Sequence, residues 1–257
     1  MRNRRVFNVC LLSVAACLAV APSHAQSADQ SKPPMYIYVS EWAVPRAQWA
    51  DMAKVDEQDR SLMDKLVSDG TLISYGSLTN LIHQEGEPTH TTWMSASSEG
   101  NLLKALEAVY ANPGSTTAPV EAASKHWDYF LVSRVYNHRS GKSENGYFAG
   151  EAWNVKPGQM RAYVSLVKSA VVPVFDKLVA DGTVTAYSMD TEDFHTGNLG
   201  RVTFVFATPD AAAFDKASKA MDDAFDNNPS LSAAMMSMVD REGHRDFLDR
   251  VTYMSNK

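Results

Sequence analysis

Cysteine is almost missing from this 257-residue chain, and both copies, Cys10 and Cys17, lie near its beginning. Residues 26–257 therefore contain no disulfide framework, and thiolate nucleophiles and cysteine metal ligands are excluded there. Packing alone must hold this part of the chain together. It is long enough to bury cores in two domains of about a hundred residues each.

An excess of positive charge is missing as well. Lysine and arginine number 24 against 30 aspartate and glutamate, a net charge of −6. An acidic chain without a basic stripe is a poor nucleic-acid binder. Beyond the first residues, no apolar run approaches the length that crosses a membrane. Nucleotide-binding glycine loops, the nucleophile elbow and H-E-x-x-H are also absent. We therefore expect no nucleic-acid partner, no membrane partner for the mature chain and no cofactor.

The beginning of the chain has the pattern of an export signal. Arginines at 2, 4 and 5 precede the apolar run 6–21, and Ser23 and Ala25 are the small residues of a cleavage site. We expect cleavage after Ala25, a periplasmic or secreted location, and a disordered segment over 26–34. Losing three arginines would take the net charge from −6 to −9. A twin-arginine signal, or a lipoprotein anchored at Cys17, remains open.

An internal repeat is the strongest pattern in the sequence. The segment DKLVSDGTLISY at 64–75 returns as DKLVADGTVTAY at 176–187. Weaker matches join 40–49 with 151–160, 91–99 with 202–210, and 126–130 with 244–248. A period of about 110 residues is that of a domain rather than a solenoid module. We expect one repeat over 35–137, a Gly/Ser-rich linker over 138–146 and a second repeat over 147–257.

Each repeat has the pattern strand, helix, strand, strand, helix, strand. Alternating β-branched and aromatic residues predict the strands, and apolar residues at helical spacing over 163–178 predict an amphipathic helix. Pro173 should kink that helix. Its counterpart in the first repeat has a polar middle, KVDEQDR at 54–60, and is less clearly helical. Gly70 and Gly182 should end these helices, and Ser98 and Thr208 are the expected N-caps of the second helices.

The βαββαβ order is the ferredoxin-like plan, which leaves one face of its sheet bare. We expect an α+β fold in which two such repeats pack sheet-to-sheet as an intramolecular α+β barrel. With this order, the duplication and the aromatic Trp93, the chain resembles the dimeric α+β barrel superfamily over residues 35–256. The resemblance implies a monomer, because the duplication replaces a dimer. It also implies a ligand site in the barrel or between sheet and helices. The superfamily includes cofactor-independent monooxygenases, small isomerases and haem-binding proteins.

Strand parity separates Tyr36, Tyr38, Ser40 and Trp42 from Ile37, Val39 and Glu41. We expect Ile37 and Val39 to face the helices and the aromatic set to face the space between the sheets. Such aromatics could line a ligand site or simply fill the core. The predicted ligand-binding residues are Tyr38, Trp42, Tyr75, Trp93, Trp153, Tyr187 and Arg201.

Glu151 is the candidate catalytic residue. A carboxylate in aromatic surroundings has a raised pKa and can act as a general base, unless Arg201, Arg134 or Arg250 pairs with it or it is exposed near the end of the strand. An H-x-D pattern occurs at 126–128 and 244–246, where histidine and aspartate can meet on one strand face; its presence in both repeats is more typical of a shared structural turn. The other histidines match no metal spacing and no haem setting, so no metal site is predicted. Those histidines are His83, His90 and His195.

Together these observations favour an exported protein that binds a small aromatic or hydrophobic ligand in or near its barrel. A cofactor-independent monooxygenase- or isomerase-like enzyme, using Glu151 or a histidine as base, is the alternative. A non-catalytic structural or interaction protein is the second alternative.

Overall fold

Residues 32–112, 118–195 and 199–257 are described by a computed structural model. The expected signal, its cleavage site and Cys17 lie outside the described residues. Lys32 and Pro33 contact the folded part, because the hydroxyl of Tyr136 donates to the Pro33 carbonyl at 2.9 Å and Lys32 Nζ donates to Asn137 Oδ1 at 3.0 Å. No helix in the described residues is both long and apolar enough to span a membrane.

The described chain alternates strands and helices. In order, its elements are β1 (Met35–Trp42), the 3-10 turn η1 (Arg46–Gln48), α1 (Trp49–Ser68), β2 (Ser74–Asn80), β3 (His90–Ala96), α2 (Glu99–Tyr110), α3 (Ala118–Glu121), β4 (His126–His138), β5 (Gly141–Ser143), β6 (Tyr147–Val155), α4 (Met160–Ala170), α5 (Val172–Ala180), β7 (Ala186–Phe194), β8 (Arg201–Thr208), α6 (Ala211–Asp226), α7 (Pro229–Met238) and β9 (Val239–Asn256).

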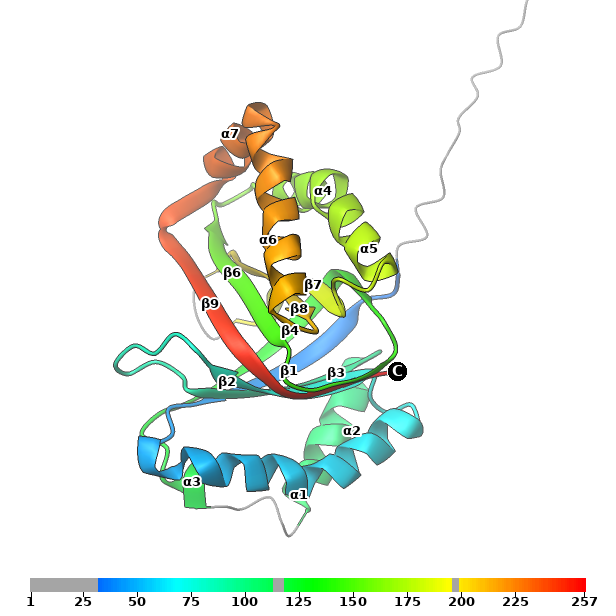
Figure 1. Ribbon diagram of the computed structural model, residues 1–257, viewed down its shortest axis with the longest axis vertical. Coiled ribbons are helices and arrows are strands. Elements are labelled where there is room, and N and C mark those ends of the chain that lie inside the picture. Colours follow the sequence, from blue (N-terminus) through cyan, green and yellow to red (C-terminus); the bar gives the residue numbers. More distant parts are fainter. Residues whose placement is uncertain (1–31, 113–117, 196–198) are drawn as a thin grey trace, which may run out of the picture. The chain divides into compact units, whose positions relative to one another are not determined.

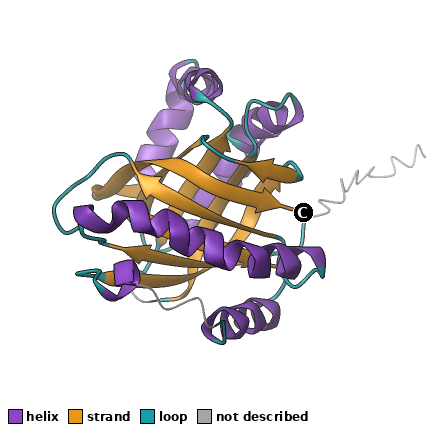
Figure 2. Cartoon of the chain, turned by 60° about the horizontal axis from the view of Figure 1, so that its bottom comes forward, coloured by secondary structure: helices purple, strands orange, loops and turns teal. Residues whose placement is uncertain are grey.

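Eight of these strands form a closed antiparallel barrel. Their order is β2-β3-β1-β4-β7-β8-β6-β9, and pairing between β9 and β2 closes the ring. The short β5 pairs with the end of β9. Helices α1, α2 and α3 lie on one side of the barrel and α4 to α7 on the other (Figures 1 and 2). The fold is therefore α+β, as expected, and edge pairing of β4 with β7 and of β2 with β9 leaves the ring without a free edge.

The prediction of which face of β1 lines the barrel is wrong. Ile37, Val39 and Glu41 point into the barrel, whereas Tyr38, Ser40 and Trp42 face the helices. The grouping by parity is correct, but both faces of a helix-covered barrel are buried. Hydrophobicity therefore does not distinguish the inner face from the outer one.

Local signals at the helix ends were more reliable. Gly70 and Gly182 follow α1 and α5 with φ of 85° and 83°, the left-handed conformation that favours glycine. The Ser98 hydroxyl caps α2 by accepting from the Asn101 N–H at 3.2 Å. Thr208 does not cap α6, because it is the last residue of β8. Asp210 does so instead, accepting from the Ala213 N–H at 2.8 Å.

The first helix of each half behaves differently. α1 runs unbroken through the polar segment 54–60. The corresponding helix of the second half divides at Val171 into α4 and α5, with Pro173 in the first turn of α5, as the expected kink requires. The polar middle of α1 contributes side chains to the wall of a pocket between this helix and the barrel.

Candidate functional site

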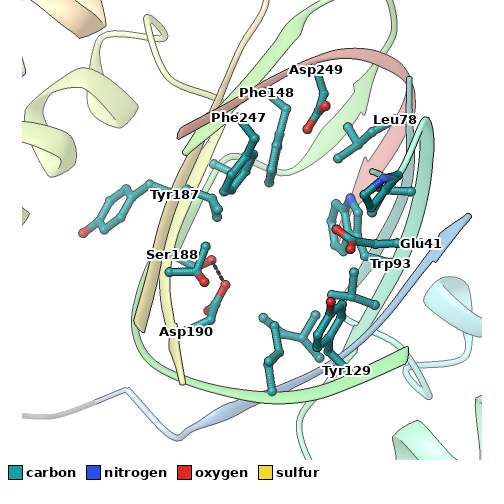
Figure 3. Close-up of a pocket in the computed structure, with 18 of the residues that line it drawn as sticks. Glu41, Leu78, Trp93, Tyr129, Phe148, Tyr187, Ser188, Asp190, Phe247 and Asp249 are labelled. Carbon is teal, nitrogen blue, oxygen red and sulfur yellow. Dashed lines mark hydrogen bonds between the residues drawn. The ribbon is translucent and has the colours of Figure 1, made fainter. Parts of the chain in front are cut away.

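Two cavities of similar size occur in the described residues. One, the barrel cavity, has a volume of about 390 Å³ and is enclosed by the inner faces of the strands (Figure 3). The other, the helix-side pocket, has a volume of about 380 Å³ and lies between α1, α2 and the outer face of β1, β2 and β3. Both are large enough for a small organic molecule. Trp93 lines both, and its indole leaves no room for a side chain at Gly76, where a Cβ would lie 2.7 Å from Nε1.

The helix-side pocket is mainly apolar. Its polar groups come mainly from the middle of α1, from the ends of β1 and β4, and from Ser77 and Thr92 on β2 and β3. The apolar lining consists of Met52, Val55, Met63, Met94, Leu106, Val109 and Val120. A mostly apolar cavity with a few convergent polar groups is the usual form of a small-molecule site.

Side chains smaller than phenylalanine keep this pocket open. In the register of β3 against β1, Thr92 and Met94 occupy the positions that Phe204 and Phe206 occupy in β8 against β6. The two phenylalanines pack on Phe175 with ring centroids 4.9 and 5.4 Å away, so the space under α4 and α5 is filled. The first half thus leaves a pocket where the second half has a packed core.

Asp56 is the most distinctive polar group of the helix-side pocket. It lies on the polar face of α1, and the Ser77 hydroxyl donates to its Oδ2 at 2.6 Å. Within the described residues no hydrogen bond is made to its Oδ1. Burial raises the pKa of Asp56 to about 6, opposed by the Ser77 hydrogen bond and by Arg60. Asp56 is therefore mostly ionised at neutral pH and able to accept a proton.

Ser40, His126 and Asp128 meet at the rim of this pocket. His126 Nε2 lies 3.1 Å from Ser40 Oγ and 3.0 Å from Asp128 Oδ1, and Ser40 also donates to Asp128. Serine and aspartate therefore contact the same ring nitrogen. In a Ser-His-Asp triad the acid binds the opposite nitrogen, so this cluster is not arranged as a triad. The Trp42 ring stacks on His126 at 5.1 Å.

Tyr75 and Tyr187 anchor helices to strands. The Tyr75 hydroxyl donates to Asp64 at 2.9 Å, and the Tyr187 hydroxyl donates to Asp176 at 2.8 Å. Burial and these hydrogen bonds raise the pKa of both phenols. Tyr187 borders the barrel cavity, but its ring points away from it (Figure 3).

Buried acids distinguish the barrel cavity. Asp190 is 6% exposed and Asp249 is 4% exposed, and each has an Oδ1 with no partner in the described residues. Figure 3 shows both carboxyl groups, together with Glu41, directed into the cavity. Burial raises the pKa of Asp190 to about 6 and that of Asp249 to about 7. The pattern of the sequence gave no sign of these residues, because an aspartate within a strand usually marks a solvent-facing position.

Arginines lie toward one end of the barrel cavity. Arg245 forms an ion pair with Glu87. Burial raises the pKa of Glu41, and the charges of Arg201 and Arg245 oppose that rise. Of the predicted ligand-binding residues, Arg201 lines the barrel cavity. Tyr38, Trp42 and Tyr75 line the helix-side pocket instead.

Glu151 and Trp153 lie under the helices of the second half. Burial raises the pKa of Glu151, as expected for a candidate base. Its nearest basic partner in the described residues is His244, with Nε2 at 4.0 Å, rather than an arginine. Trp153 stacks on His244 at 3.8 Å and belongs to the packed core. Glu151 therefore borders neither cavity.

The predicted contact within each H-x-D pattern is present, since His244 Nε2 lies 3.1 Å from Asp246 Oδ1, much as in the first half. Ligand atoms of Glu151, His244 and Asp246 lie within 4.8 Å of one another, close enough to hold a metal ion. His90 is buried away from such clusters, and burial lowers its pKa to about 4.

No protein-family model and no curated protein sequence matches the chain. Solved structures do resemble it. A candidate monooxygenase from Lactobacillus acidophilus NCFM is 11% identical with a TM-score of 0.66, covering 88% of this chain and 97% of its own. A candidate monooxygenase from Fusobacterium nucleatum subsp. nucleatum ATCC 25586 is 12% identical with a TM-score of 0.64, covering 87% and 94%. An anthrone oxidase-like protein is 9% identical with a TM-score of 0.53, covering 88% and 94%. The chain thus has the dimeric α+β barrel fold.

Proposed function

We propose that the protein is an enzyme that binds a small, mainly apolar ring compound in the helix-side pocket and removes a proton from it. The observation that carries the proposal is an open apolar pocket with Asp56 in its wall, at a place where the second half of the barrel is filled. The Asp56 carboxylate accepts from Ser77 through Oδ2 and makes no hydrogen bond through Oδ1 within the described residues.

Asp56 accepts the proton in this proposal, and Arg60 stabilises the charge left on the ligand. Arg60 lines the same pocket, lies over the Tyr253 ring at 4.1 Å, and forms ion pairs with Glu57 at 3.1 Å and Glu144 at 3.4 Å that hold it in place. A fixed cation beside a developing enolate stabilises the transition state more than the ground state. The apolar walls exclude water from the reacting atoms.

Two reactions can follow proton removal without a cofactor. The enolate can regain the proton at another carbon, which is an isomerisation. It can also react with dioxygen, as in oxidation of anthrone: the CH₂ group becomes C=O, one oxygen atom enters the product, and the other leaves as water with the two hydrogens. The names of the similar structures favour testing the oxidation first. The proposal uses no haem, because His126, the histidine that lines the pocket, has its Nε2 engaged by Ser40 and Asp128.

We further propose that the chain is an exported monomer formed by duplication of a ferredoxin-like unit. Support comes from the strand orders β2-β3-β1-β4 and β7-β8-β6-β9, which follow the same plan in both halves. The N-terminal sequence supports export. Sedimentation equilibrium of the mature chain tests the monomer, and N-terminal sequencing of the secreted protein tests the cleavage site.

Filling the pocket tests the proposed site. The Thr92→Phe variant supplies the side chain that the second half has at Phe204, and it should weaken binding of anthrone or 1-naphthol by at least about tenfold, or 1.4 kcal/mol. Titration calorimetry measures the effect. The matched control is Thr203→Phe, which places the same side chain in the barrel cavity and should leave ring binding unchanged. Equal affinity in wild type and Thr92→Phe would remove the helix-side pocket as the site.

A further inference from the structure

The barrel cavity contains buried carboxyl groups that the proposed reaction does not use. Asp190 and Asp249 lie on different strands, β7 and β9, and both carboxyl groups point into the cavity (Figure 3). The Ser188 hydroxyl donates to Asp190 Oδ2 at 2.9 Å, which leaves its Oδ1 unpartnered. Asp249 Oδ1 is likewise without a partner in the described residues.

Neither acid is directly paired with a cation in the described residues, although Arg201 and Arg245 line the same cavity. Arg245, which lowers the pKa of Asp249 by its charge, is bound to Glu87. An unpaired buried carboxylate is costly, and a buried polar oxygen without a partner points to a missing donor.

Apolar side chains form part of the cavity wall. They include Ile37, Val39, Leu78, Phe148, Val205 and Phe247. A molecule that satisfies both features carries N–H donors and positive charge on an apolar body. A neutral apolar ring would leave the carboxylates unpaired, and an anion would be repelled by them.

We propose that the barrel cavity is a second binding site, which takes an organic amine whose ammonium groups donate to Asp190 and Asp249. The ammonium supplies both the charge and the hydrogen-bond donors that the two carboxylates lack. The site is separated from the helix-side pocket by the sheet and shares only Trp93 with it.

Titration calorimetry with linear diamines of increasing chain length tests the proposal. We expect one chain length to bind best, and the diol of that length to bind at least about tenfold more weakly. Asp190→Asn and Asp249→Asn should each weaken diamine binding by at least about tenfold, because each removes a charge-assisted hydrogen bond. The control is Glu242→Gln, which makes the same change in charge at an exposed position of β9. Equal binding of diol and diamine, unchanged diamine affinity in both the Asp190→Asn and the Asp249→Asn variants, or no diamine binding would each overturn the proposal.

Reciprocal variants separate the two sites. Thr203→Phe narrows the barrel cavity and should abolish diamine binding, while Thr92→Phe fills the helix-side pocket and should leave it unchanged. Because neither variant alters an acid, a loss confined to Thr203→Phe cannot be a consequence of removing a charge. Diamine binding that is lost in Thr92→Phe and kept in Thr203→Phe would contradict the assignment to the barrel.

Discussion

Replacing Asp56 with asparagine is expected to lower kcat/KM for the ring compound by about 10²–10⁴-fold, the usual contribution of a general base. Asparagine keeps the size of the side chain and can still bond to Ser77, but it cannot take the proton. Binding of the ring compound should change little, because the apolar walls are intact. The loss should therefore appear in kcat rather than in KM.

The pH profile of the wild-type enzyme gives a second readout of the same residue. Burial raises the pKa of Asp56 to about 6, so the base is ionised above that pH and protonated below it. We expect kcat/KM to fall as pH decreases through about 6. The control is Asp51→Asn, an acid on the same helix whose side chain is 48% exposed, which should keep wild-type turnover. Turnover by Asp56→Asn equal to that of wild type would rule out Asp56 as the base.

Asp249→Asn is expected to raise the free energy of unfolding above pH 7 by on the order of 4 kcal/mol. Burial and the nearby Glu41 raise the folded pKa of Asp249 to about 7, and Arg245 opposes them. An unfolded aspartate titrates near 3.9. The folded state therefore holds a proton that the unfolded state has lost, and wild-type stability from this group falls as pH rises from about 4 to about 7.

Urea unfolding of both proteins across this pH range measures the effect. The difference in unfolding free energy between Asp249→Asn and wild type should be near zero below about pH 4, rise to pH 7 and then stay constant. Carboxyl groups that do not interact with Asp249 titrate alike in both proteins and cancel in the difference. Glu242→Gln should show no such trend. A difference that is flat with pH would mean that the Asp249 carboxyl is not perturbed by burial.

This cost in stability agrees with a binding role for the barrel cavity. Natural proteins commonly keep destabilising groups where function needs them. An amine that pairs with Asp190 and Asp249 would also recover part of the lost stability, since a ligand that binds only the folded state stabilises it.

Element order and helix ends could be predicted from the sequence because their signals are local. Gly70 and Gly182 end their helices through a backbone conformation that glycine alone adopts easily. The Ser98 cap depends on one hydroxyl and a nearby N–H. Such features need no knowledge of what packs above or below them.

Strand faces could not be predicted in the same way. The sequence match of 91–99 with 202–210 aligns Trp93 with Phe204. In the strand registers, however, Thr91 pairs with Glu41 and Thr203 pairs with Ala152, so the structural counterpart of each residue lies one position further along than the sequence match gives. A shift of one residue moves every side chain to the other face. Trp93 therefore lines the barrel cavity, while Phe204 packs under the helices.

The acids of both cavities were missed for a related reason. Asp56 lies in the polar middle of α1. This polar segment weakens the prediction of a helix and gives no indication that the helix forms a pocket wall. Asp190 and Asp249 lie within strands, where burial depends on how the sheet closes. Glu151 was chosen because aromatics flank it, yet its counterpart in the first half, Ser40, lies beside the open pocket.

The crystal structure of the protein soaked with anthrone tests the central claim most directly. The account predicts the ring system between α1 and the outer face of β1, β2 and β3, with its enolisable carbon within proton-transfer distance of Asp56 Oδ1. A ring bound in the barrel cavity instead, or a helix-side pocket that stays empty at saturating anthrone, would contradict it.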